Sequence, residues 1–213
     1  MSYKNSFQKN NEPAHALLSP SQHSWINYDK DKLMNRYYSS FAQDIGTAVH
    51  EYAENSIKYR IKFTKQMKNA LLLHLVSKGI PEQAIDIDFI APNLYNYIND
   101  GIGFLMDTEQ KLKYSDLCFG TADSIICRDN LLRIHDLKTG KTPADMIQLQ
   151  IYAALFCLEQ RVNPEDLAFE LRIYQANEII LDRPTSIDIR PLMEHIIWAD
   201  QVLREGGAGN ARQ

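Results

Sequence analysis

The sequence predicts an α/β fold with a mixed central β-sheet flanked by helices. Two short apolar β runs, 124–127 and 131–134, are joined by three residues of hairpin-turn composition. A second such pair, 170–174 and 178–181, follows later in the chain. Helical apolar spacing precedes, separates and follows these pairs. Helices on both sides of strand pairs in the chain order are typical of a sheet covered by helices.

The chain totals favour one globular domain. The protein has 213 residues, 45% of them apolar, and a net charge of −4. We expect a flexible segment at 1–16, one domain at 17–205 and a disordered tail at 206–213. Neither a membrane-spanning run nor a signal-peptide core is evident, so we expect a cytoplasmic protein with no membrane partner.

The first half of the chain is predicted to be helical. Ser19 or Ser21 can cap a helix with Pro20 in its first turn, and a weak helical pattern continues to Ser40. From Asp44 an apolar stripe predicts one long helix that ends at 78–81. A short helix is expected around 93–97, with two glycines after it as breakers.

The second half carries the strands. A charged strand is expected at 106–113, before the hairpin. The loop 139–143 contains Gly-Lys-Thr but lacks the upstream glycine and cradle of a P-loop. Strong helical spacing then predicts a helix at 144–160, and a closing amphipathic helix is expected at 189–204.

Acidic residues mark the ends of the predicted hairpin. Asp123 opens its first strand and Asp136 closes its second, so antiparallel pairing makes them neighbours. Lys138 lies two residues further and shares a face with Asp136. Two acids converging on one spot are unfavourable unless a cation lies between them, which predicts a divalent metal. The alternatives are a strand-capping Asp123 and a surface ion pair of Asp136 with Lys138.

These residues resemble the motifs of the PD-(D/E)XK nuclease superfamily, in its RecB-like branch. The motifs in chain order are Gly46-xxx-His50, Asp123, Asp136-x-Lys138 and Gln148-xxx-Tyr152. Each alone is a weak signal, and together they span about half of the chain. The branch includes the RecB and AddAB nuclease domains and small phage exonucleases.

The resemblance implies a restriction-endonuclease-like core and a metal-dependent DNA nuclease. The expected activity is exonucleolytic, on single-stranded ends, in recombination, repair or phage DNA processing. Mg²⁺ or Mn²⁺ would be held by His50, Asp123, Asp136 and the backbone carbonyl of Leu137. Lys138 would hold the attacking water and stabilise the developing charge.

Three further residues have candidate roles in that site. Gln148 and Tyr152, one helical turn apart, would orient the substrate and help to hold Lys138. Glu109 is either an additional active-site acid or a surface residue. For His50, packing beside an apolar stripe is the alternative to metal binding.

The predicted DNA contact is a basic cluster in the long helix, whose alternative is an ordinary solvated face: Lys58, Arg60, Lys62, Lys65 and Lys68. The net negative charge does not exclude DNA, because local charge acts within a Debye length of about 8–10 Å. No ATP-hydrolysing motif is present, so unwinding would require a separate helicase or recombination partner.

The three cysteines are expected to be buried free thiols. Cys118, Cys127 and Cys157 lie in or beside apolar runs without a close pair, so we expect no iron–sulfur cluster. Two alternatives to a DNA nuclease stay open. One is an inactive nucleic-acid-binding or scaffold protein that keeps the nuclease fold, and the other is an RNA-directed nuclease.

Overall fold

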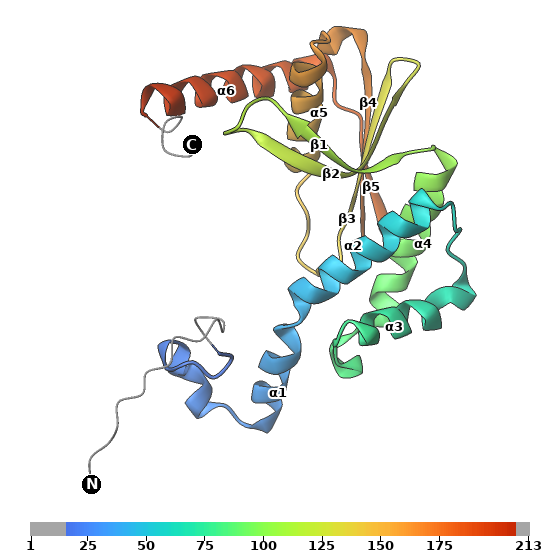
Figure 1. Ribbon diagram of the computed structural model, residues 1–213, viewed down its shortest axis with the longest axis vertical. Helices are drawn as coiled ribbons and strands as arrows, with labels where there is room; N and C mark the ends of the chain where they lie inside the picture. The colour runs from blue at the N-terminus through green and yellow to red at the C-terminus, as the bar shows by residue number, and fades with distance from the viewer. Residues whose placement is uncertain (1–15, 208–213) are drawn as a thin grey trace.

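A computed structural model describes residues 16–207 and shows a five-stranded mixed sheet (Figure 1). The strands lie in chain order, with β3 and β4 parallel and every other neighbouring pair antiparallel. Their bounds are β1 (Asp107–Lys113), β2 (Phe119–Arg128), β3 (Leu131–Leu137), β4 (Ala168–Gln175) and β5 (Glu178–Asp182). The predicted α/β class with a mixed sheet flanked by helices is confirmed.

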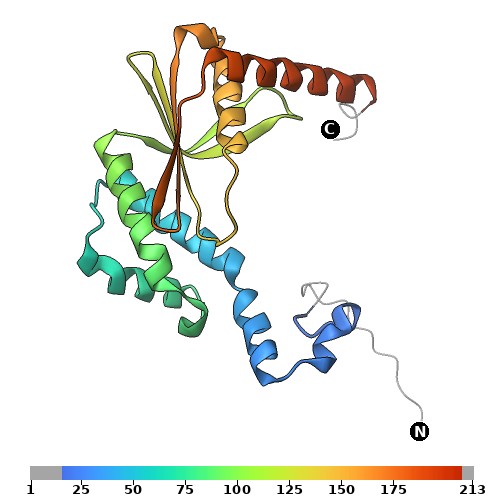
Figure 2. The ribbon, with the colours of Figure 1, turned by 180° about the vertical axis from the view of Figure 1, so that it is seen from behind.

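Helices cover both faces of this sheet (Figures 1 and 2). The α-helices are α1 (Lys30–Ser39), α2 (Ala42–Lys58), α3 (Lys68–Ser77), α4 (Ile87–Gly103), α5 (Ile147–Gln160) and α6 (Ser186–Glu205). Short 3₁₀ helices are η1 (Pro20–Asn27), η2 (Lys65–Met67), η3 (Glu82–Ala84) and η4 (Pro164–Asp166). Helix α5 forms the crossover that parallel strands β3 and β4 require.

The alternation of side chains in the strands separates two apolar cores. Leu137 and Tyr174 pack with α2, α3 and α4 on one face. Ile134 and Ile173 point to the other face and pack with α5 and α6. Because successive strand residues alternate between faces, a single strand register buries the apolar residues of both faces in their respective cores.

Both predicted hairpin turns are confirmed. Asp129 and Asn130 have φ of 51° and 59°, and Ala176 and Asn177 have φ of 52° and 62°. Two successive positive φ values are the signature of a type I′ turn, whose twist matches the flanking strands. The turn at 129–130 therefore sets the register of β2 against β3. Strand β2 begins at Phe119, so Asp123, which was predicted to open the strand, lies inside it.

The long helix predicted from Asp44 to Ser77 is wrong. It is interrupted after α2, and a loop and η2 connect it to α3. Arg60, with φ of 55°, turns the chain, and the Ile61 N–H donates to the Ser56 carbonyl. This turn allows Leu71 of α3 to join the core that α2 already covers.

The short helix predicted at 93–97 is the centre of the longer helix α4. Gly101 was expected to end it, yet lies inside the helix. A Cβ there would lie 2.7 Å from Cδ1 of Ile57, so glycine permits the close approach of α4 to α2. At the N-terminus, the weak helical pattern up to Ser40 forms two helices, η1 and α1, with Asp29 capping the second.

The cysteine prediction holds only in part. Cys157 is buried, whereas Cys118 is half-buried and Cys127 is exposed near the end of β2. All three thiols are free. Cys127 lies next to the last residue of β2, just before the hairpin turn at 129–130.

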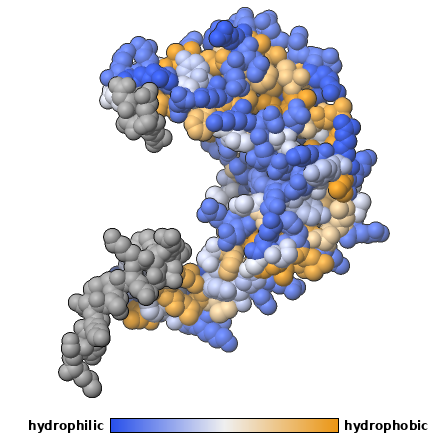
Figure 3. Space-filling view, viewed as in Figure 1, coloured by the Kyte–Doolittle hydropathy of each residue, from blue (hydrophilic) through white to orange (hydrophobic). Residues whose placement is uncertain are grey.

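The molecule has an arched outline. Helices α1 and α6 extend from the body, and the space-filling view shows a hollow between these extensions (Figures 1 and 3). Gly206 and Gly207 form a turn after α6, while the rest of the predicted tail and residues 1–15 lie outside the described residues. Between residues 16 and 207, no helix combines the length and apolar character needed to cross a bilayer.

Candidate metal centre

Asp123 and Asp136 meet where the β2–β3 hairpin ends. The last registered pair is Ser124 with His135, and the two aspartates occupy the next position. The Leu137 N–H donates to Oδ2 of Asp123 at 3.0 Å. The predicted proximity of the two acids is confirmed, and their alignment follows from the hairpin register.

Lys138 connects the sheet to α5. Its Nζ lies 2.9 Å from Oδ1 of Asp136 and 3.1 Å from Oε1 of Gln148. Its backbone N–H donates to the Tyr174 carbonyl at 3.0 Å, which extends the β3–β4 pairing by one residue. The predicted grouping of Asp136, Lys138 and Gln148 is confirmed. Asp136 is buried, so its bond with Lys138 is more than the surface pair considered above.

His50 reaches the same place from α2. Its Nδ1 lies 3.4 Å from Oδ2 of Asp123, which favours a site residue over simple packing. Gly46 and His50, one helical turn apart, line a pocket of about 500 Å³ together with Glu109 and Asp123. One donor atom from each of His50, Glu109 and Asp123 lies within 4.8 Å of the others. The three residues come from α2, β1 and β2.

Glu109 enters this group through an unusual backbone. Its φ is 49°, a left-handed value that costs a residue other than glycine about 1–3 kcal/mol. In the pairing of β1 with β2, Thr108 lies opposite Ser124 and Gln110 lies opposite Ala122. Glu109, between them, interrupts the pairing at the position of Asp123. The distortion therefore coincides with the position nearest the acidic site. Glu109 is exposed but lies beside His50 and Asp123, so its role as an additional active-site acid stays a prediction.

The structure brings the predicted ligand set together in part. His50, Asp123 and Asp136 were expected to converge, whereas the compact group holds Glu109 and not Asp136. The reason is that Asp136 turns toward Lys138, and its Oδ2 is buried with no hydrogen-bond partner among the described residues. Leu137 donates its backbone N–H to Asp123. Its carbonyl, the predicted ligand atom, stays a prediction.

The electrostatics of the group favour a cation. Burial raises the pKa of Asp123, and the nearby Asp136 carboxylate raises it further, against the opposing effects of His50, the Leu137 N–H and Lys138. Burial also raises the pKa of Glu109, with Asp123 adding to the rise. Acids that resist ionisation in one another's presence, with an imidazole beside them, match the donor set of a hard or borderline divalent ion. Oδ2 of Asp136, which has no hydrogen-bond partner between residues 16 and 207, is a further carboxylate oxygen next to this group.

Tyr152 lies against the backbone of β2 at Gly120. A Cβ on Gly120 would lie 2.8 Å from Cε1 and 3.2 Å from Oη of the Tyr152 ring. Burial raises the pKa of Tyr152, and its interaction with Gln148 lowers it in part. Gln148 and Tyr152 thus face the site together, as their spacing predicts. In the sequence, the only sign that position 120 requires glycine is its place in the Gly-Thr-Ala-Asp segment that ends at Asp123.

The basic cluster does not form one helical surface. Only Lys58 belongs to α2, and the chain then turns away. Lys58 and Arg60 line a cavity that adjoins the metal centre. Lys65 and Lys68 line a separate pocket beside α4, where Lys68 pairs with Asp88. Lys62 is exposed in the loop between the two.

Comparisons with known proteins give one family. Residues 15–163 match the model of a family described as "Protein of unknown function (DUF2800)". A solved structure titled "Crystal structure of SSO0001" shares 13% identity and covers 70% of this chain and 85% of that chain, with a TM-score of 0.29. A TM-score this low carries no argument about fold or function.

Proposed function

The chain belongs to the DUF2800 family, and we propose that it is a metal-dependent nuclease that hydrolyses phosphodiester bonds in DNA. Its kinship within the PD-(D/E)XK superfamily, in the RecB-like branch, is part of this proposal. The observation that carries it is a single site in which His50, Glu109 and Asp123 adjoin the Asp136–Lys138 pair.

The residues present fit a divalent cation. His50, Glu109 and Asp123 would hold Mg²⁺ or Mn²⁺, with Asp136 and the Leu137 carbonyl as further oxygen donors. When bound, such an ion supplies a water of lowered pKa and compensates charge on the phosphate. The imidazole makes Mn²⁺ a better match than it would be for an all-oxygen site.

Lys138 is the cationic group nearest the acids. Its side chain is 30% exposed, so it can contact a substrate phosphate while Asp136 and Gln148 restrict its position. A positioned ammonium stabilises negative charge that develops on the phosphate oxygens. It also orients a water for attack, which leaves the proton of that water to a neighbouring carboxylate or to solvent.

Gln148 and Tyr152 act on position rather than on charge. Gln148 accepts from Lys138 and so keeps the ammonium directed into the site. Tyr152 packs against Gly120 in β2, three residues before Asp123, whose charge acts on its hydroxyl. Both sit on α5, whose packing against the sheet fixes them relative to the carboxylates.

A cleavage assay tests this function. End-labelled single-stranded DNA, duplex DNA and RNA of one sequence are incubated with Mg²⁺ or Mn²⁺, and products are sized over time. We expect shortening of single-stranded DNA by the wild type and its loss in Asp136→Asn. The matched control is Lys141→Met, which removes an exposed lysine three residues after Lys138. No cleavage by the wild type, or equal cleavage by Asp136→Asn, rejects the proposal.

The same assay separates the alternatives. Cleavage of RNA but not DNA would identify an RNA-directed nuclease. DNA binding that persists in EDTA without product would identify an inactive scaffold. With an active DNA nuclease, we propose a role at single-stranded ends in the cytoplasm, in recombination, repair or phage DNA processing, together with a separate helicase where duplex must be opened.

A further inference from the structure

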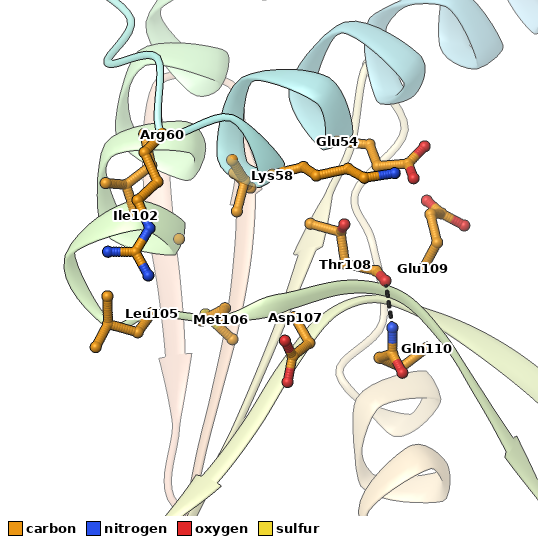
Figure 4. Close-up of a pocket in the computed structure, with 12 residues that line it drawn as sticks. Glu54, Lys58, Arg60, Ile102, Leu105, Met106, Asp107, Thr108, Glu109 and Gln110 are labelled. Atoms are coloured by element: carbon orange, nitrogen blue, oxygen red, sulfur yellow. Dashed lines mark hydrogen bonds between the residues drawn. The ribbon is translucent and has the colours of Figure 1, made fainter.

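A cavity of about 520 Å³ adjoins the metal centre, a volume within the range of ligand pockets, roughly 300–1,000 Å³ (Figure 4). It lies between the C-terminal ends of α2 and α4 and the first half of β1. Glu54 and Glu109 line both this cavity and the pocket in front of His50. A molecule bound in the cavity would therefore be continuous with one at the metal centre.

Three residues with a left-handed backbone line this cavity. Residues other than glycine with positive φ fall into two groups within the described chain. The first occupies hairpin turns and one helix end: Asp129, Asn130, Arg161, Ala176 and Asn177. The second group is Arg60, Leu105 and Glu109, and all three line the cavity. Arg60 and Leu105 also lie at helix ends, as Arg161 does, so the second group is distinguished by the cavity that its three members share.

Two of these residues occupy positions that favour glycine. Arg60 follows the C-cap of α2, and Leu105 follows the C-cap of α4. The Ile61 N–H donates to the Ser56 carbonyl at 2.8 Å, and the Met106 N–H donates to the Gly101 carbonyl at 2.9 Å. Glycine is the usual residue at this left-handed position after a helix. Here the chain instead places an arginine and a leucine that is 39% exposed.

The side chains around the cavity divide by chemistry. Ile102 and Leu105 form an apolar wall, and the Arg60 guanidinium lies beside them (Figure 4). The Lys58 side chain extends toward Glu54 and Glu109, at the end nearer the metal centre (Figure 4). An apolar wall with a cation beside it matches a nucleotide, whose base can make apolar contacts with the aliphatic wall while its phosphate is attracted by the charge. A base stacked in a duplex has both faces covered, so only an unpaired base could lie on this wall.

We propose that this cavity holds one unpaired nucleotide of a DNA strand whose next phosphate lies at the metal centre. Leu105 and Ile102 contact the base, Arg60 contacts its phosphate, and Lys58 contacts the strand at the end of the cavity nearer the metal centre. Glu54, Asp107 and Glu109 also line the cavity, so we expect the strand to bind firmly only with a divalent cation at the adjoining carboxylates. This inference rests on the proposed function, for which it specifies a single-stranded substrate.

Glycine substitutions test the proposal, because they relieve strain and remove the binding side chain together. Arg60→Gly and Leu105→Gly are compared with Arg161→Gly, an exposed left-handed residue at the end of α5, away from the cavity. Each is made in a Lys138→Met background to prevent cleavage. Binding of a fluorescent oligothymidylate in Mn²⁺ is measured by anisotropy, and Tm by thermal unfolding.

We expect all three glycine variants to raise Tm and only Arg60→Gly and Leu105→Gly to weaken oligothymidylate binding, by about tenfold each. A blunt duplex should bind weakly and show no difference among the variants. Affinities of Arg60→Gly and Leu105→Gly equal to that of Arg161→Gly would overturn the proposal. So would equal losses for single-stranded and blunt duplex DNA.

The two proposals fail in different ways. If the wild type binds oligothymidylate through Arg60 and Leu105 but cleaves nothing, the nuclease proposal fails and the nucleotide site stands. If the wild type cleaves DNA and both glycine variants bind as the control does, the nucleotide site alone is wrong.

Discussion

Nδ1 of His50 lies 3.4 Å from Oδ2 of Asp123, which ties the middle of α2 to the open end of the β2–β3 hairpin. The same Oδ2 accepts the Leu137 N–H, so the aspartate is held from both a helix and a strand. Glu109 completes the group from the neighbouring strand. The site is thus assembled by three elements that no local pattern connects.

Divalent cations should stabilise the protein through this group. Because the pKa of Asp123 is raised, its folded state favours the protonated carboxyl, and ionisation costs stability as pH rises above the unfolded value. A bound cation offsets that cost at neutral pH. At a concentration 100 times its Kd, Mn²⁺ should add about 2.7 kcal/mol to the free energy of unfolding. Chemical denaturation with and without Mn²⁺ at pH 7.5 measures this.

Asp123→Asn supplies the matched control for the metal effect. The amide oxygen can still accept the Leu137 N–H, while the ionised ligand is removed. The variant should be at least as stable as the metal-free wild type and should gain little from Mn²⁺. An equal gain in both proteins would place the ion elsewhere.

Lys138 should matter for both stability and turnover. Lys138→Met leaves the buried Asp136 carboxylate without its cation. We expect a loss of about 1–3 kcal/mol, less than the 3–5 kcal/mol typical of a broken buried pair, because Lys138 is partly exposed. Adding Asp136→Asn should recover part of this loss, and urea denaturation of the single and double variants measures the coupling. Additive losses would show that the two side chains do not interact.

Gly120→Ala should displace Tyr152. The added Cβ would lie 2.8 Å from Cε1 of the ring, so the side chain or β2 must move, at a cost of about 1–3 kcal/mol. In the Tyr152→Ala background the same change should cost much less, since the clash is absent. Thermal unfolding of the four proteins checks this, and equal costs in both backgrounds would refute it.

His135 should make the fold sensitive to acid. It is fully buried against Tyr174 and Phe104, and burial lowers its pKa to about 3, so the folded state keeps it neutral. Between pH 6.5 and about 3 the unfolded chain binds a proton that the folded chain does not, so stability falls as pH falls. His135 alone should account for roughly 2 kcal/mol between pH 7 and pH 5.

Comparison with His135→Phe isolates that contribution. Urea denaturation at several pH values should show a shallower dependence between pH 5 and pH 7 in the variant than in the wild type. The carboxylates are common to both proteins and cancel in the comparison. Identical slopes would mean that the imidazole is protonated in the folded state.

Local patterns were sufficient for the strands and for half of the site. The Asp129-Asn130 turn and the apolar runs on either side of it predict the hairpin, and the hairpin register brings Asp123 beside Asp136. Strand side chains alternate with a period of two, which predicts that Lys138 lies on the same face as Asp136. These relations depend on residues close in sequence or on the geometry of one hairpin, which composition encodes directly.

Other features depend on packing between distant elements. The apolar stripe of α2 and α3 is compatible with one long helix, and the break at Arg60 carries no glycine to mark it. The left-handed backbone of Glu109 is likewise invisible in residue type, so its place in the ligand group required the structure. Asp136 was expected in the compact group because it adjoins Asp123, but proximity does not determine side-chain direction, and its carboxylate turns toward Lys138.

The central claim is that one divalent ion site is formed by His50, Glu109 and Asp123. Anomalous difference density from crystals grown with Mn²⁺ tests it most directly. We predict a peak within coordination distance of these three side chains, lost in crystals of Asp123→Asn. A Mn²⁺ peak elsewhere on the protein, with none between the imidazole and the two carboxylates, would contradict the account.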